Sequence, residues 1–272
     1  VKLDDGTVVP SRMVGKFRLH GKKLTNPVAV GDRVQLEMEE NSEFGSIKKI
    51  EDRKNYVIRQ SPRKKHFLHI IASNIDLALL IVTIKEPNLK QGFIDRFLLM
   101  TEPYNIPVYI LFNKADIYSE DDKALFDYLQ DIYHNIGYEC LLVSAESGEG
   151  LDQVKEIIQG KTSLFAGQSG VGKSSIINQL APNLTLRTKD ISEFSGKGQH
   201  TTTFAEMFEL ENQTRIIDSP GIKTLSYNHL EVQDVAHNFK EFFTMSKHCK
   251  FADCMHREEP KCAVKDAIEK DE

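Results

Sequence analysis

The segment Gly167–Ser174 constrains the fold of this 272-residue chain more than any other. Its letters, GQSGVGKS, fit the pattern G-x-x-x-x-G-K-[ST] of loops whose backbone N–H groups bind phosphate at the start of a helix. The apolar stretch Ser163–Ala166 precedes the loop as a predicted strand, and a predicted helix begins at Ser174. The pattern requires this order of strand, loop and helix, so the sequence predicts an α/β domain that binds a nucleoside triphosphate. The alternative is a glycine-rich turn that occurs here by chance.

The phosphate loop also assigns roles to individual side chains. Lys173 would reach the β- and γ-phosphates, and Ser174 would bind the accompanying Mg²⁺ ion. The loop by itself does not specify the base. The predicted nucleotide contacts in the loop are Gly167, Gln168, Ser169, Gly170, Val171, Gly172, Lys173, Ser174 and Ser175.

Two further loops are candidates for reading the base. Asn113-Lys114-Ala115-Asp116 follows the apolar predicted strand Pro107–Phe112, and Ser144-Ala145 follows the predicted strand Cys140–Val143. The Asp116 carboxylate would accept two hydrogen bonds from guanine but would be left unpaired against adenine, so such a site discriminates strongly. Asn113, Lys114 and Ala115 would fix the loop around the base, with Ser144 and Ala145 closing over it. Together these loops predict guanine, whereas the tetrapeptide alone could be a polar turn.

The switch elements of a nucleotide hydrolase are predicted near residue 200 and after the strand Arg215–Ile217. Asp218 would hold Mg²⁺ through water, and the Gly221 N–H would sense the γ-phosphate. A threonine of the segment 201–203 would complete the Mg²⁺ shell; Thr203 is our choice, with Thr202 the alternative. Ile222 stands where Ras-like GTPases place a glutamine that orients water, so His200 is our candidate for that role. The alternative is a solvated loop histidine.

The spacing of apolar segments predicts three parts. Residues 1–62 contain short predicted strands and are expected to form an OB-like β-barrel whose first strand is trimmed. Residues 63–226 alternate strands and helices, which predicts a mostly parallel sheet covered on both faces. Residues 227–272 are expected to form a small helical domain whose C-terminus is trimmed. The expected strands are Thr7–Val9, Met13–Leu19, Arg33–Met38, Ser46–Ile50, Leu77–Ile84, Pro107–Phe112, Cys140–Val143, Ser163–Ala166, Phe204–Leu210 and Arg215–Ile217, and Arg59–His66 is interpreted as a linker.

Four cysteines are too few for a disulfide framework at this length, and three of them are clustered. Cys249, Cys254, His256 and Cys262 offer three thiolates and one imidazole, a set typical of a closed tetrahedral zinc site. His248 is an alternative to His256, and three reduced cysteines without metal are the alternative to zinc. Cys140 stands apart and is expected to be a small buried residue.

The net charge of −5 conceals an uneven distribution. Residues 1–66 carry a net charge of +6, and the remainder carries −11. Such asymmetry indicates a surface for nucleic acid or membrane, although a merely solvated surface is the alternative. The basic residues in question are Lys16, Arg18, Lys22, Lys23, Lys48, Lys49, Arg53, Lys54, Arg59, Arg63, Lys64 and Lys65.

The order of the motifs points to a family. Asn113–Asp116 precedes the phosphate loop, which precedes Asp218–Gly221, whereas ordinary GTPases place the phosphate loop first and the Asn-Lys-x-Asp segment last. The chain therefore resembles the circularly permuted GTPases, in particular the RsgA (YjeQ/YloQ) family of GTPases that depend on the small ribosomal subunit. The matching stretches are FAGQSGVGKSS (165–175), LRT…GKGQHTTT (186–203), DSPG (218–221) and the Cys/His cluster.

The resemblance implies a function. It implies hydrolysis of GTP to GDP and phosphate, binding to the small (30S) ribosomal subunit and its 16S rRNA, and a role in late maturation of that subunit. It also implies Mg²⁺ bound with GTP and one structural Zn²⁺. With no signal peptide and no membrane span in the sequence, we expect a cytoplasmic monomer. Two alternatives are a stand-alone nucleotide hydrolase and a non-enzymatic RNA-binding adaptor.

Overall fold

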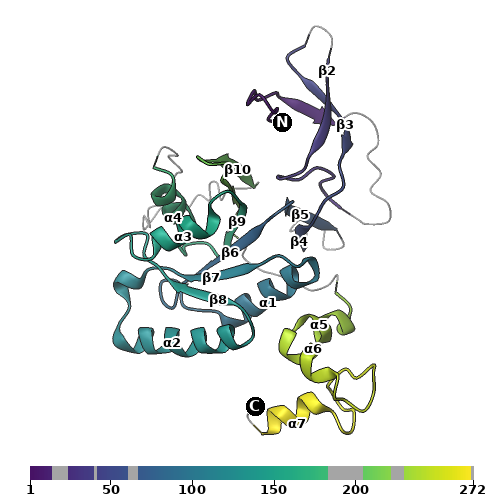
Figure 1. Cartoon of the computed structure of the whole chain (residues 1–272), viewed down its shortest axis with the longest axis vertical. Coiled ribbons are helices and arrows are strands. Elements are labelled where there is room, and N and C mark those ends of the chain that lie inside the picture. The colour runs from purple at the N-terminus through teal and green to yellow at the C-terminus, as the bar shows by residue number, and fades with distance from the viewer. Residues whose placement is uncertain (14–23, 40–41, 61–66, 183–204, 222–229, 271–272) are drawn as a thin grey trace, which may run out of the picture.

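The computed structural model describes residues 1–13, 24–39, 42–60, 67–182, 205–221 and 230–270 (Figure 1). A central sheet with its helices carries strands of the N-terminal segment on one side and a group of C-terminal helices on another. Strands β2 (Val34–Met38) and β3 (Gly45–Ile50) lie at one end of the molecule, and helix α7 (Ala263–Glu269) lies at the other.

The central sheet has six strands in the order β10-β11-β9-β6-β7-β8. All neighbouring pairs are parallel except β10 and β11, which are antiparallel at one edge. The prediction of a mostly parallel sheet is therefore confirmed. The strands are β6 (Leu77–Val82), β7 (Val108–Phe112), β8 (Glu139–Leu142), β9 (Thr162–Gly167), β10 (Glu206–Glu209) and β11 (Arg215–Asp218).

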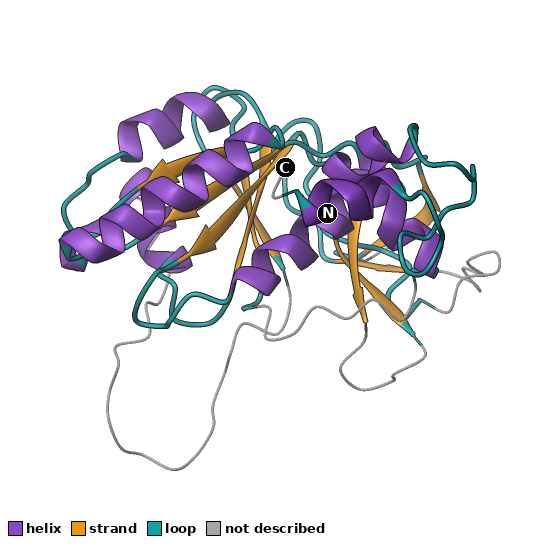
Figure 2. Ribbon diagram, turned by 90° about the horizontal axis from the view of Figure 1, so that it is seen from below, coloured by secondary structure: helices purple, strands orange, loops and turns teal. Residues whose placement is uncertain are grey.

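Helices cover both faces of this sheet (Figure 2). The central strand β6 is a run of six buried apolar residues whose side chains alternate between two hydrophobic clusters. Ala78, Leu80 and Val82 pack with α1 and α2 on one face, while Leu77, Leu79 and Ile81 pack with α3 and α4 on the other. A strand buried on both faces needs such a continuous apolar run, and each larger side chain contributes about 1.5–3 kcal/mol. The helices are α1 (Gln91–Thr101), α2 (Glu120–Asn135), α3 (Leu151–Ile158) and α4 (Lys173–Leu180), with short 3₁₀ turns at Glu102–Tyr104 and Ala115–Ile117.

The residues at the two ends of helix α2 explain where the helix begins and ends. Ser119 caps the helix by accepting a hydrogen bond from the Asp122 N–H, and the Asp122 side chain accepts one from the Ser119 N–H in return. Acidic residues fill the first turn, where they interact favourably with the helix dipole. Gly137, with φ of +88°, follows the helix in a conformation that favours glycine.

The N-terminal strands form a three-stranded sheet in the order β1-β3-β2, with β1 at Ser11–Met13. A separate hairpin pairs β4 (Tyr56–Gln60) with β5 (Leu68–Ser73). Isolated bridges from Leu24 to Leu68 and from Val30 to Ala72 join the hairpin to the N-terminal segment.

The N-terminal predictions are confirmed only in part. The strands expected at Arg33–Met38 and Ser46–Ile50 are present as β2 and β3. The expected strand Thr7–Val9 is reduced to one bridge between Lys2 and Val8. The interpretation of Arg59–His66 as a linker is wrong at its start, because β4 continues through Arg59 and Gln60.

A buried ion pair joins the N-terminal segment to the end of β5. Arg53 donates from Nε and Nη2 to the two carboxylate oxygens of Asp32, both at 2.7 Å, and Nη2 also donates to the Pro27 carbonyl. Asp32 further accepts from the Ser73 hydroxyl at 2.5 Å and from the Ala29 N–H at 2.9 Å. The Asp32 side chain is 1% exposed, so this network is held in a dehydrated environment where a missing partner is costly.

The C-terminal helices are α5 (Val232–Asn238), α6 (Lys240–Ser246) and α7. Helices α6 and α7 pack around a small cluster of their own, and α5 contacts α6 through the rings of His237 and Phe243. They contact the central domain through Lys240, whose ammonium lies 3.4 Å from Glu102 Oε2 and 3.9 Å from the ring centre of Tyr138. The Tyr138 hydroxyl donates to the same Glu102 oxygen at 2.9 Å. Among the described residues, no helix is both long and apolar enough to cross a membrane.

Candidate nucleotide and metal sites

Four loops carrying predicted site residues meet at one edge of the central sheet. They follow β7 (Asn113–Asp116), β8 (Ser144-Ala145), β9 (Gly167–Ser174) and β11 (Asp218–Gly221). These four strands run parallel, so their carboxyl ends face the same edge, where open α/β sheets bind their ligands. The structure therefore brings together residues that are up to about a hundred positions apart in the sequence.

Asn113 joins three of these loops. Its side chain is 1% exposed, donates from Nδ2 to the Val171 carbonyl at 2.8 Å and accepts at Oδ1 from the Ala145 N–H at 3.1 Å. Gly172 has a φ of +90°, and a Cβ there would collide with the Asn113 amide. The close approach explains the glycine and fixes the base-reading loop against the phosphate loop.

The loops after β7 and β8 also meet at Asp116. The Ser144 hydroxyl donates to Asp116 Oδ1 at 2.5 Å and accepts from the N–H groups of Glu146 and Ser147 at 3.2 and 3.1 Å. Ser144 is fully buried whereas Asp116 is exposed. The serine thus orients a carboxylate that faces solvent, as a group that accepts hydrogen bonds from a ligand must.

The phosphate loop turns sharply into α4. Gly170 and Gly172 have φ of +85° and +90°, and Lys173 is the first helical residue. Lys173 is 9% exposed, and its ammonium donates to the carbonyls of Gly167 and Gln168 at 3.3 and 3.2 Å. Burial lowers the pKa of Lys173, and the Asp218 carboxylate opposes this shift. A buried cation at a helix N-terminus is a strong site for an anion.

Asp218 lies beside this cation with an unmet hydrogen-bonding capacity. Its Oδ1 is buried and has no hydrogen-bond partner in the described part of the chain. Burial raises the pKa of Asp218 to about 6, although Lys173 acts in the opposite direction. An unpaired carboxylate oxygen is a ligand type that Mg²⁺ and its bound water prefer. A Cβ on Gly221 would lie 3.4 Å from Ser169, so the segment after β11 contacts the phosphate loop directly.

Two residues that support the site were not predicted. The Tyr118 hydroxyl donates to the Asn113 carbonyl at 2.6 Å and accepts from the Ile84 N–H at 2.8 Å. Gln179 donates to the Ala145 carbonyl at 3.0 Å. Both act through three-dimensional proximity, and neither belongs to a recognisable motif. His200, Thr202 and Thr203 lie outside the described residues.

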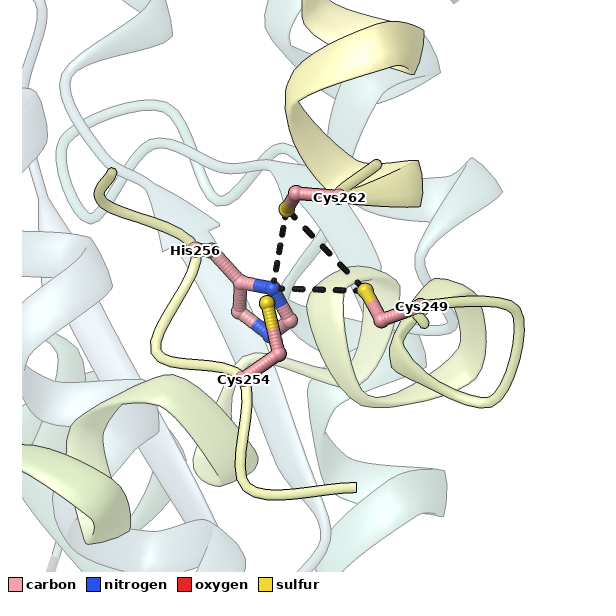
Figure 3. A group of neighbouring side chains, drawn as sticks. All are labelled: Cys249, Cys254, His256 and Cys262. Carbon is pink, nitrogen blue, oxygen red and sulfur yellow. Dashed lines mark hydrogen bonds between the residues drawn. The ribbon is translucent and has the colours of Figure 1, made fainter. Parts of the chain in front are cut away.

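Cys249, Cys254, His256 and Cys262 converge on one point (Figure 3). Their candidate ligand atoms all lie within 4.8 Å of one another. His256 Nδ1 is 3.3 Å from Cys262 Sγ and 3.7 Å from Cys249 Sγ, and the two sulfurs are 4.0 Å apart. Zinc–sulfur bonds of about 2.3 Å in a tetrahedron place sulfurs roughly 3.8 Å apart, so the group fits zinc. The group contains His256 and not the alternative His248.

The surroundings of the cluster also suit a structural metal. Cys254 and Cys262 are buried, and the Cys262 sulfur accepts from the Lys265 N–H at the start of α7. These four side chains could fill all four positions of a tetrahedral ion, which would leave none for a substrate. Cys140 lies apart in β8, where burial raises the pKa of its thiol to about 12, and it behaves as the predicted buried residue.

Most basic residues of the N-terminal segment that the structure describes are paired with carboxylates. Lys48 lies 2.8 Å from Glu37, Lys49 lies 3.1 Å from Glu51, and Lys54 lies 3.3 Å from Asp76. Local pairing reduces the field expected from the net charge alone. Arg59 has no such partner among the described residues. Seven other basic residues lie outside them: Lys16, Arg18, Lys22, Lys23, Arg63, Lys64 and Lys65.

Comparison with known proteins decides the family. The model of the family described as RsgA GTPase matches residues 50–228. The chain belongs to the RsgA GTPase family. The small ribosomal subunit biogenesis GTPase RsgA of Flavobacterium psychrophilum is 49% identical over 100% of this chain and 84% of its own length. The protein of the same name from Bacteroides fragilis is 48% identical over 99% and 86%.

Solved structures agree with the RsgA assignment. YjeQ from Thermotoga maritima is 34% identical and superposes with a TM-score of 0.75, covering 98% of this chain and 85% of its own. YloQ, described as a circularly permuted GTPase, is 29% identical with a TM-score of 0.69, covering 99% of this chain and 82% of its own. The predicted family and its permuted α/β fold are therefore confirmed.

Proposed function

We propose that this chain hydrolyses GTP to GDP and phosphate in the biogenesis of the small ribosomal subunit. The observation that carries the proposal is the meeting of four loops at the carboxyl edge of the sheet, with Asp116 at one end and Lys173, Ser174 and Asp218 at the other. Relatives that match the chain over 98–100% of its length are named small ribosomal subunit biogenesis GTPases.

The base end of the site would select guanine. Asp116, oriented by Ser144, accepts from the ring N–H and the exocyclic amine of guanine, whereas adenine has no amine at that position. Asn113 keeps the loop in place, Lys114 and Ala115 flank the carboxylate, and Ala145 closes the opposite side. A ligand without donors at these positions leaves the carboxylate unpaired, which is the physical basis of selectivity.

The phosphate end would bind and activate the triphosphate. Residues Gly167–Ser175 surround the phosphates, and the Lys173 ammonium exchanges the carbonyls of Gly167 and Gln168 for phosphate oxygens. Ser174 and Thr203 would bind Mg²⁺ and Asp218 would hold its water. The ion would neutralise charge that develops on the β- and γ-phosphate oxygens. Gly221 would contact the γ-phosphate.

His200 is our proposal for the residue that orients the attacking water. The water oxygen bonds to the γ-phosphorus while the bond to the β–γ bridging oxygen breaks, leaving GDP and inorganic phosphate. Ile222 occupies the position after Asp218–Gly221 and has no polar group for this task. Replacement of His200 by alanine should retain nucleotide binding and lose stimulated turnover.

The remaining parts would serve recognition. We propose an RNA-contacting OB-like barrel at residues 1–62, the GTPase domain at 63–226 and a zinc-binding domain at 227–272. One Zn²⁺ held by Cys249, Cys254, His256 and Cys262 would supply structural cross-linking. The proposed partners are the 30S subunit and its 16S rRNA, bound by a cytoplasmic monomer.

Phosphate release tests the proposal. Turnover of GTP is measured with no addition, with small ribosomal subunits and with large subunits. Stimulation by small subunits alone supports the proposed function. High turnover without ribosomes would indicate a stand-alone hydrolase, and absence of turnover in all three arms would indicate a nucleotide-dependent adaptor. Lys173→Ala serves as the control, since loss of the buried cation should abolish turnover in every arm.

A further inference from the structure

Residues 83–87 follow the central strand β6 and form a further loop at the carboxyl edge of the sheet. On one side this loop lies beside the phosphate loop, because a Cβ added to Gly170 would lie 3.8 Å from Pro87 Cδ. On the other side, the Lys114 ammonium donates to the Glu86 carbonyl at 2.5 Å. The loop therefore contacts both the phosphate-binding and the base-reading parts of the proposed site, although none of its residues is among the predicted nucleotide contacts.

The 83–87 loop is closed by its own hydrogen bonds and anchored in the core. The Thr83 hydroxyl donates to the Pro87 carbonyl at 2.6 Å, and the Leu89 N–H donates to the Ile84 carbonyl at 2.9 Å. Thr83 and Ile84 are both buried. Residues that are fixed by packing and by hydrogen bonds can hold the elements of a site in place. The loop is therefore a rigid support for the segments that contact it.

The Tyr118 hydroxyl connects this support to both ends of the base-reading loop. It accepts from the Ile84 N–H at 2.8 Å and donates to the Asn113 carbonyl at 2.6 Å. Burial raises the pKa of Tyr118 to about 12, so the hydroxyl keeps its proton at neutral pH. Asp116 lies between Asn113 and Tyr118 in the sequence. One buried hydroxyl thus limits the movement of the segment that carries the Asp116 carboxylate.

Lys85 forms a second connection at the point where the base-reading loop enters helix α2. Its ammonium lies 2.7 Å from Asp122 Oδ2, and the same oxygen accepts from the N–H and the hydroxyl of Ser119, both at 2.8 Å. Hydrogen bonding from Lys85 lowers the pKa of Asp122 to about 2, and Ser119 adds to the shift, so the carboxylate is ionised at neutral pH. Because the pair is partly exposed, it should contribute little to the stability of the fold.

We propose that Tyr118 and Lys85 are positioning residues for guanine selection, because they hold the segment that carries Asp116 against the 83–87 loop. This inference rests on the proposed function, since it concerns the same nucleotide site. A hydrogen bond weakens steeply when its donor and acceptor move out of line. A less restrained Asp116 would therefore lose part of its bond to the exocyclic amine of guanine, while the phosphate loop would still bind the phosphates.

The ratio of the affinities for GDP and inosine diphosphate tests the inference. The two nucleotides differ in the exocyclic amine, which hypoxanthine lacks. Both are titrated into the full chain with Mg²⁺ by calorimetry, with ADP as a third ligand. Tyr118→Phe removes the bridging hydroxyl and keeps the ring. Lys85→Met removes the charge and keeps a side chain of similar length, and Lys85→Arg restores the charge.

Two residues of α2 provide matched controls. Tyr133→Phe also removes a buried tyrosine hydroxyl, which donates to the Asp95 carboxylate of α1 instead of to the base-reading loop. Lys123→Met removes a lysine whose ion pair with Glu120 lies on the exposed side of the helix. Thermal unfolding of every variant is recorded beside the titrations, so that a general loss of stability is detected separately.

The unmodified chain should bind GDP about 10-fold or more tightly than inosine diphosphate, because a hydrogen bond to a charged group is at stake. This ratio should fall by about threefold or more in Tyr118→Phe, which leaves two backbone groups without the hydroxyl. It should also fall in Lys85→Met, recover in Lys85→Arg and stay unchanged in both controls. Lys85→Met should melt close to the unmodified chain, and it decides the test if Tyr118→Phe does not fold.

The outcomes separate this inference from the proposed function. Equal affinity of the unmodified chain for GDP and ADP would contradict guanine-nucleotide binding and the inference together. A chain that prefers GDP to ADP, but whose ratio of GDP to inosine diphosphate is the same in Tyr118→Phe and Lys85→Met, overturns the inference alone. Equal losses of affinity for both nucleotides in these variants would show a merely structural role and would overturn it as well.

Discussion

The side-chain amide of Asn113 lies 2.8 Å from the carbonyl oxygen of Val171, which joins the loop after β7 to the phosphate loop after β9. The same side chain accepts from the Ala145 N–H on the loop after β8. One buried amide therefore fixes the base-reading and phosphate-binding parts of the proposed site relative to each other.

Asn113→Ala should weaken GTP and GDP binding equally. The change leaves the Val171 carbonyl and the Ala145 N–H without partners, at about 1–3 kcal/mol each where they stay buried. We expect both affinities to fall by roughly 10-fold or more in titration calorimetry. Asn135→Ala, at the exposed end of α2, is the control. Selective loss of GTP binding with intact GDP binding would contradict the bridging role.

Asp116→Asn should change the base preference. The amide can still accept from Ser144 but presents an N–H₂ group to the exocyclic amine of guanine, so two donors face each other. Xanthine carries a carbonyl oxygen at that ring position and should bind instead. A competition between GDP and xanthosine diphosphate should shift by about 100-fold or more. An unchanged preference for guanine would show that Asp116 does not contact the base.

Removal of zinc should affect the C-terminal helices and leave nucleotide binding intact. The small cluster around Cys254, Cys262 and Val264 buries too few residues to be stable without a cross-link. Metal analysis should find one zinc per chain, and chelation should increase hydrogen exchange within residues 240–269 while GDP affinity stays the same. Cys262→Ser should lose the metal and Cys140→Ala should keep it. Retention of zinc by Cys262→Ser would contradict the ligand set.

Glu241→Gln should stabilise the fold at neutral pH but not in acid. Burial raises the pKa of Glu241, with Asp95 and Glu102 adding to the shift, so the folded chain holds this proton more tightly than the unfolded chain. The resulting stability is present below the unfolded pKa of about 4.3 and is lost as pH rises through the raised pKa. Glu241 is half-buried and screened by solvent, so the gain at pH 7.5 should stay below about 1 kcal/mol.

Urea unfolding of Glu241→Gln at pH 4 and pH 7.5 measures this difference. Glu120→Gln, which alters a side chain that is 92% exposed, should show no such pH dependence. If Glu241→Gln changes the stability equally at both pH values, the pKa of Glu241 is not raised in the folded chain.

Asp32→Ala should destabilise the chain by about 3–5 kcal/mol in urea unfolding, because it leaves the Arg53 guanidinium buried without its carboxylate. Asp152→Ala is the matched comparison. Its ion pair with Lys155 is exposed, so the loss should stay below about 1 kcal/mol. Equal effects of the two substitutions would show that burial of the Arg53–Asp32 pair does not matter.

The strands and helices of the central domain can be predicted from the sequence, because the patterns that indicate them lie within short segments. The run at Leu77–Val82 indicates a strand buried on both faces, and the phosphate loop fixes the position of β9 and α4. The cysteine spacing alone indicates a metal site, and the four side chains do lie together.

The sequence does not predict the β4–β5 hairpin, because the basic residues and the proline that follow Arg59 favour a linker. Contacts between distant parts of the chain cannot be predicted from the sequence either. The sequence alone predicts Arg53 as part of a basic surface, whereas in the fold it is largely buried in an ion pair with Asp32, twenty-one positions earlier. The hydrogen bond from Tyr118 to the Asn113 carbonyl likewise cannot be predicted without knowing the path of the chain after the 3₁₀ turn Ala115–Ile117.

The contact of Lys240 with Glu102 and Tyr138 is small, yet it joins two parts of one chain. Only eight residues separate Gly221 from Leu230. A short covalent tether keeps two modules at an effective concentration of about millimolar, so a contact too weak to hold separate molecules can keep them together. A partner that binds the C-terminal helices in another position competes against this weak contact, strengthened by the high local concentration. When the partner is released, the original contact forms again without a search through solution.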